Sequence, residues 1–108
     1  MRDKITINDR EIEMAANAAS PFIYQKIFHE DFETIAKDVN AWRKMCFVMA
    51  KQAELGEVEL YNGKLTETDC LIWLMDFDPM DFADLLNFAA DLYSRQQKTK
   101  STPKKQAG

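Results

Sequence analysis

The sequence predicts a mainly α-helical, compact domain of about four helices with a small N-terminal β-hairpin. Only three Gly and three Pro occur in 108 residues, which favours long regular elements. Apolar residues also recur at steps of three and four through most of the chain, as on the buried face of a helix. The 46% hydrophobic and 30% charged content is that of one ordinary globular domain with a single core. We expect this domain to span residues 1–94.

The chain opens with a pattern typical of a hairpin, over about residues 4–16. Residues 5–7 are β-branched and alternate, Asn8 and Asp9 are turn residues, and residues 11–14 alternate again. Two strands alone are marginal in water, so this hairpin must pack on the helices or pair with another chain.

Two helices are predicted next. The first covers residues 21–28, because Ser20 can cap it and Pro21 suits the first helical position. A long helix over residues 32–55, ended by Gly56, has a broad apolar face and is expected to be the central, most buried element.

In the second half of the chain, the sequence predicts a connection followed by two more helices. Residues 57–64 are expected to form a polar connection, in which a second short hairpin is an alternative. Thr66, with Asp69 three residues on, resembles a capping box and opens the third helix. The last helix begins with Asp78 as its cap and Pro79 behind it.

Charge divides the chain into an acidic body and a basic end. All 18 acidic residues and nine of the 14 Lys and Arg lie in residues 1–94, a net charge of −9. Residues 95–108 carry five basic residues, no acidic one and no periodicity, so we expect a basic, disordered tail. An acidic body repels phosphate, so no nucleic-acid partner is expected.

The cysteines and apolar runs indicate a cytoplasmic protein. The longest continuous apolar run, Met45–Ala50, is too short to span a bilayer, and no secretory leader is evident at the start. Cys46 and Cys70 lie in apolar helical patterns without metal-binding spacing, which favours buried, reduced thiols, with a disulfide as the alternative. No cofactor or metal is expected.

One segment resembles a known family. The hairpin around Ile5–Arg10 is followed by Ser-Pro-x-x-Tyr-x-x-x-Phe-x-x-Asp, with Pro21, Tyr24, Phe28 and Asp31 as the matching positions. This pattern is similar to the tail assembly chaperones of long-tailed phages and related prophages of Gram-positive bacteria. It covers about the first third of the chain. His29 departs from it, because a small residue such as Gly is expected after the Phe.

The resemblance implies a non-enzymatic function in phage tail morphogenesis. Such a chaperone binds the tape measure protein, recruits tail tube subunits, assembles as a homo-oligomer in the host cytoplasm and is absent from the mature virion. The four matching residues would then define the fold. The alternative is a small protein-binding adaptor or regulatory domain that acts as a monomer or dimer. An enzyme is the third option, disfavoured because no nucleophile–base pair or metal spacing is visible.

A candidate partner surface rests on large aromatic and acidic side chains. Aromatic residues dominate binding hot spots, but on apolar helical faces they also build cores. The acidic cluster can equally cap helices or meet a basic partner. The candidates are Trp42, Trp73, Asp76, Asp78, Asp81 and Asp84.

Overall fold

The computed structural model describes the backbone of residues 1–107 and the side chains of residues 1–95. It confirms a mainly helical fold with an N-terminal hairpin. Strands β1 (Arg2–Ile7) and β2 (Arg10–Ala15) pair antiparallel, with Ile5 opposite Ile12. Asn8 and Asp9 both have positive φ, 49° and 64°, as a tight two-residue hairpin turn requires. The hairpin packs on helices, with β2 against α2 and β1 against α5.

Helix α1 (Ala19–Phe28) confirms the first predicted helix, but its start differs from the expected Ser20 cap. The cap position is Ala18, whose side chain cannot hydrogen-bond, and the side-chain oxygen of Asn17 just before it accepts the N–H of Ala19 at 2.9 Å. Ser20 is instead fully buried, and its hydroxyl donates to Gln52 Oε1 at 2.8 Å. The helix ends at His29, whose φ of 60° is the left-handed conformation that Gly would adopt readily.

The prediction of one helix over residues 32–55 is wrong at its start. A 3₁₀ turn, η1 (Phe32–Thr34), is followed by a loop, and α2 (Val39–Leu55) begins only after Asp38. Asp38 Oδ1 accepts the N–H of Asn40 at 2.9 Å, so this cap defines the start. Gly56 ends the helix with a φ of 86°, as predicted.

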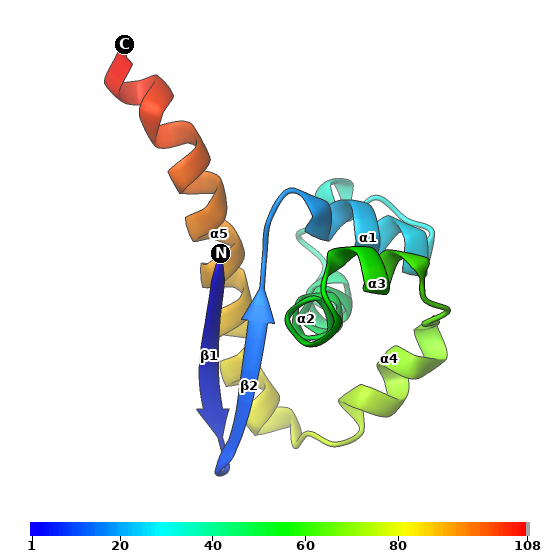
Figure 1. Cartoon of the computed structure of the whole chain (residues 1–108). Helices are drawn as coiled ribbons and strands as arrows, with labels where there is room; N and C mark the ends of the chain where they lie inside the picture. Colours follow the sequence, from blue (N-terminus) through cyan, green and yellow to red (C-terminus); the bar gives the residue numbers. More distant parts are fainter. Residues whose placement is uncertain (108) are drawn as a thin grey trace.

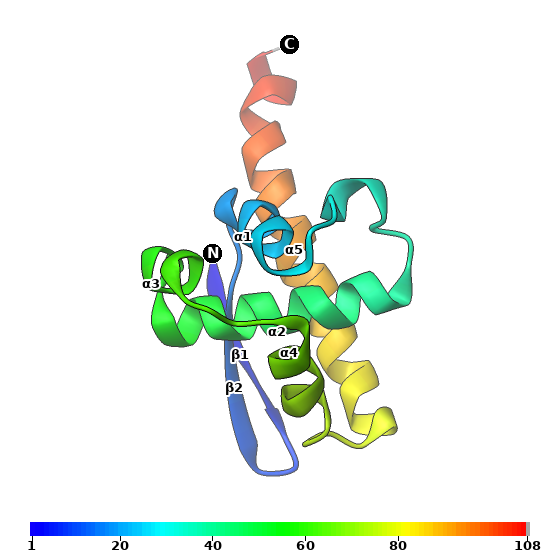
Figure 2. The ribbon, with the colours of Figure 1, turned by 90° about the vertical axis from the view of Figure 1, so that its right-hand side faces the viewer.

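Helix α2 is the centre of the molecule. In Figure 1 it is seen end-on between the hairpin and helices α1, α3 and α4, and Figure 2 shows it lying across the hairpin. Met45, Cys46, Phe47, Val48 and Met49 are all fully buried, so this segment is enclosed on every side. The expectation that this helix is the most buried element is confirmed.

Residues 57–64 form neither the polar connection nor the hairpin that the sequence predicts. They contain helix α3 (Glu57–Asn62), which brings the number of α-helices to five within the described backbone. Glu57 and Glu59 lie in its first turn, where acidic side chains favour the helix dipole. The helix packs on α1, where Phe22 stacks on Tyr61 with ring centres 5.3 Å apart.

The last two helices begin as predicted. Helix α4 (Glu67–Leu74) has the complete capping box between Thr66 and Asp69. Helix α5 (Pro79–Ala107) has Asp78 at its start, whose Oδ1 accepts the N–H of Met80 at 3.3 Å.

The expected tail at residues 95–108 coincides with the end of α5. Its backbone stays helical to Ala107 and projects away from the body (Figure 1). Arg, Gln and Lys are good helix formers, but Pro103 is unfavourable within a helix because it lacks a backbone N–H. The side chains of residues 96–108, and with them the expected disordered tail, lie outside the described part of the structure.

Candidate functional surface

The second half of helix α4 carries apolar side chains on both its inner and its outer side, although the helix lies at the edge of the molecule. Its inner face, with Cys70, Trp73 and Leu74, packs toward α2 and α5. Its outer face carries Leu71, Ile72 and Met75, which are 58%, 58% and 73% exposed. We call these three residues the outer face of α4. The first turn of α4 is polar, with Glu67, Thr68 and Asp69, so this apolar patch is confined to the second half of the helix and the residue that follows it.

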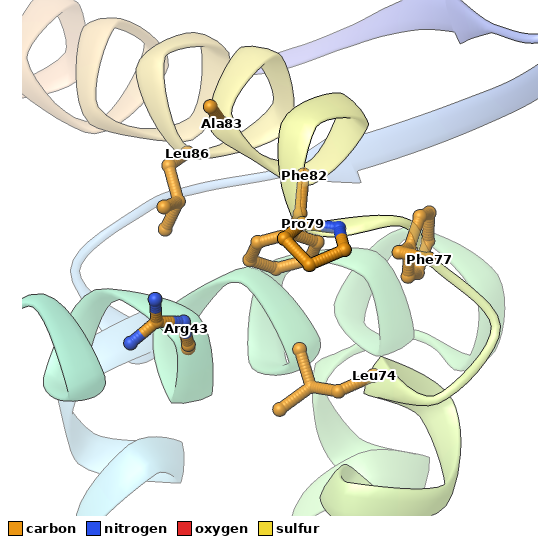
Figure 3. Close-up of a pocket in the computed structure, with 7 residues that line it drawn as sticks. All are labelled: Arg43, Leu74, Phe77, Pro79, Phe82, Ala83 and Leu86. Atoms are coloured by element: carbon orange, nitrogen blue, oxygen red, sulfur yellow. The ribbon is translucent and has the colours of Figure 1, made fainter.

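A groove adjoins this helix. It consists of two hollows, of about 360 Å³ and 300 Å³, that share Arg43 and Leu74. The larger hollow lies between α2 and the start of α5 (Figure 3). It is lined by Arg43, Leu74, Phe77, Pro79, Phe82, Ala83 and Leu86. Because Leu71 lines the smaller hollow, the groove continues directly into the outer face of α4. We call the two hollows together the α4 groove.

An aromatic cluster packs against the larger hollow. Trp73 packs edge-on against Phe77, Phe82 and Phe47, with ring centres 4.9, 5.9 and 5.8 Å away. Such aromatic pairs stabilise their arrangement beyond the area they bury. The guanidinium of Arg10, on the hairpin, lies 4.7 Å from the ring centre of Phe77. Phe77 and Phe82, which line the larger hollow, are thus held in this aromatic cluster.

The two basic residues of the groove differ in whether an acidic side chain pairs with them. Lys44 Nζ pairs with Glu30 at 3.2 Å and with Glu67 at 3.7 Å. Arg43, by contrast, makes its hydrogen bond to Asn40 Oδ1 at 2.6 Å, and no ion pair joins it to a carboxylate within residues 1–95. Asp76 and Asp78 are exposed at the α4–α5 turn, beside the larger hollow.

The structure divides the six predicted surface residues between separate places. Trp73 contacts Phe77 and Phe82 of the larger hollow but itself lines another hollow, between β2 and α2. Asp76, Asp78 and Asp81 line a further hollow together with Arg10, near the tip of the hairpin. Asp81 is half-buried and accepts a hydrogen bond from the Asn8 side chain at the hairpin tip. Asp84 is exposed on α5, one turn further along the chain.

Trp42 lies in a different cluster from the α4 groove. It is half-buried, its ring centre is 4.9 Å from that of Phe32 and 5.6 Å from that of Tyr93, and its Nε1 donates to Ala36 O at 2.6 Å. These contacts give it a structural position that ties the loop before α2 to α5.

The four motif residues lie at structural positions in α1 and η1. Tyr24 is fully buried and donates to Glu30 Oε2 at 2.5 Å, and Phe28 packs on it. Burial and this carboxylate raise the pKa of Tyr24 above its usual value, and the same bond lowers the pKa of Glu30. Asp31 caps η1 by accepting the N–H of Glu33 at 3.1 Å, and Pro21 lies in the first turn of α1.

The cysteines are two separate free thiols. Burial raises the pKa of Cys70 to about 12 and also raises that of Cys46, so both stay protonated at neutral pH. Among the described side chains, no three His, Cys, Asp or Glu residues come together as ion ligands. None of the described helices combines the length and apolar character needed to cross a membrane.

The outer face of α4 is the feature that sequence reasoning missed. Helical periodicity places Cys70, Trp73 and Leu74 on one buried stripe and leaves Leu71 and Ile72 off it. The signal was present, because five apolar residues follow one another from Cys70 to Leu74 and no single helical face can hold them all.

Comparisons with known proteins give no relative for this chain. No family model matches it, and no curated protein or solved structure matches it significantly.

Proposed function

We propose that this chain is a non-enzymatic tail assembly chaperone, which binds the tape measure protein and recruits tail tube subunits during phage tail morphogenesis. The observation that carries the proposal is the outer face of α4 beside the α4 groove. Large exposed apolar surfaces with a formed groove are typical of proteins that hold an apolar helix of another chain. The motif from Ser20 to Asp31 supplies the family resemblance.

The physical role follows from the partner's chemistry. A tape measure protein is long and helical, and its apolar stripes are exposed until the tube encloses it. A small acidic domain that covers such a stripe keeps the complex charged and dispersed, since high net charge opposes aggregation. Many copies along one long partner would be needed, which agrees with a homo-oligomer in the bacterial cytoplasm that is left out of the mature virion.

The experiment is co-expression with the longest neighbouring reading frame, followed by size-exclusion chromatography with light scattering. The proposal predicts that the long protein becomes soluble and elutes with several copies of this chain. A monomer or dimer that leaves the long protein insoluble contradicts it and favours the small adaptor or regulatory domain.

A further inference from the structure

The α4 groove contains a positive charge that its surroundings do not neutralise. Arg43 lines both hollows and projects from α2 toward Leu86 across the groove (Figure 3). In the larger hollow it is the one charged residue in an otherwise apolar lining. Its hydrogen bond is to Asn40, one turn earlier on the same helix. The guanidinium therefore has a neutral partner within its own helix but no carboxylate in an ion pair within residues 1–95.

A partner helix that fills the groove would cover this guanidinium. Arg keeps its charge throughout the accessible pH range, so the desolvation penalty of the covered guanidinium cannot be relieved by loss of a proton. An ion covered by apolar groups without a counter-ion is strongly unfavourable, whereas a carboxylate can meet the planar guanidinium with two hydrogen bonds. The free energy of binding is therefore most favourable for a partner that places a carboxylate against the Arg43 guanidinium.

We propose that Arg43 selects the partner: the α4 groove takes an amphipathic helix that carries one Asp or Glu within its apolar face, opposite Arg43. This inference rests on the proposed function, because it names the chemistry of the partner that the same groove binds. The neighbouring Lys44 does not serve this role, since Glu30 and Glu67 already pair with it.

The test uses three fluorescent 18-residue peptides with capped ends and one Leu-rich helical face. They differ at a single central position within that face, which is Glu, Gln or Lys. Fluorescence anisotropy should show that the wild-type chain binds the Glu peptide about tenfold more tightly than the Gln peptide, and the Lys peptide most weakly. In Arg43→Gln the Glu and Gln peptides should bind equally, with circular dichroism showing an intact fold.

Lys51→Gln is the matched control. It removes one positive charge from the same helix, but Lys51 pairs with Glu54 outside the groove, so the preference for the Glu peptide should remain. Equal binding of the Glu and Gln peptides to the wild type would overturn the role of Arg43 and leave the proposed function standing. Failure of all three peptides to bind would overturn both, because the groove would then not accept a helix.

Discussion

A polar network joins α1, α2, α3 and the residue Asn17 between the hairpin and α1. The loss of folding free energy when it is disrupted can be worked out bond by bond. Gln52 is fully buried on α2. Its Oε1 accepts from Ser20 at 2.8 Å, and its Nε2 donates to Asn17 Oδ1 at 3.1 Å and to Glu57 Oε2 at 3.0 Å. Asn17 Nδ2 also donates to Glu57 Oε2 at 3.0 Å, so the four side chains form a closed set.

Gln52→Met keeps the volume and removes all three bonds. The Ser20 hydroxyl is then buried without an acceptor, and Glu57 loses one donor. At about 1–3 kcal/mol for a buried group left unsatisfied, we expect the free energy of unfolding to fall by about 3 kcal/mol. Ser20→Ala breaks one of these bonds and also removes the oxygen that accepts the Asn17 N–H at 3.1 Å, so it should cost about 2 kcal/mol. The double variant, Ser20→Ala with Gln52→Met, should cost about 3 kcal/mol. It costs less than the sum of the two single variants because the Ser20 hydroxyl and the Gln52 amide oxygen, each left unpaired when only the other is removed, are then both absent.

Urea unfolding followed by tryptophan fluorescence measures these free energies. The network predicts a coupling of about 1–2 kcal/mol between Ser20 and Gln52, the difference between the double variant and the sum of the single ones. Additive effects within about 0.5 kcal/mol would refute the reasoning, since they would mean that the two side chains do not depend on each other.

The same network has a pH dependence of known sign. Three hydrogen-bond donors lower the pKa of the Glu57 carboxyl below its ordinary 4.5: the Gln52 side-chain amide, the backbone N–H of Glu57 and the Asn17 side-chain amide. A lowered folded-state pKa stabilises the fold above the unfolded-state value, and this contribution is lost as pH falls through the folded-state pKa. The destabilisation by Gln52→Met should therefore be full at pH 7 and shrink below pH 4.5. A difference that stays constant down to acid unfolding would contradict this.

Three further predictions concern single elements. Trp42→Ala should lower the free energy of unfolding by about 3 kcal/mol in urea titrations, and a loss below about 1 kcal/mol would refute its place in the aromatic cluster. His29→Gly should raise that free energy by about 0.5–1 kcal/mol, because Gly adopts the left-handed end of α1 without strain; destabilisation would show that the imidazole makes an important contact. Deletion of residues 97–108 should leave the melting temperature nearly unchanged in calorimetry, and a large fall would show that the tail docks on the acidic body.

Local chemistry explains the parts of the fold that the sequence predicted well. The turn at Asn8 and Asp9 and the capping box of Thr66 and Asp69 depend on residues within four positions of each other. Their geometry follows from those residue types, whichever way the rest of the chain folds.

The start of α2 could not be predicted in this way. Asp31 and Asp38 are both good caps, and apolar residues lie between them at helical spacing. The choice was made by packing, because the Phe32 ring fits between Trp42 and Tyr93, which lie ten and 61 positions away along the chain. Helix α3 is similar: the dipeptide Asn62 and Gly63 is typical of a turn, but the residues before it pack on α1 as a helix.

The candidate surface also has one part that follows from local sequence and one part that depends on how the helices pack. The apolar character of α4 can be read from the sequence, whereas the neighbourhood of Arg43, Leu74 and Leu86 exists only once α2, α4 and α5 are placed together. Periodicity assigned each helix one buried face. It did not reveal that α4 has a second apolar face left over after the core is complete.

The measurement that tests the account most directly compares Leu71→Asp with Val58→Asp in co-expression with the long neighbouring protein. Both variants place a carboxylate at an exposed apolar position, but Leu71 belongs to the outer face of α4 and Val58, 74% exposed, lies on α3. The readout is the soluble yield of the long protein. The account predicts that Leu71→Asp abolishes this yield while Val58→Asp retains it. Equal yields from both variants and the wild type would contradict the claim that the outer face of α4 holds the partner.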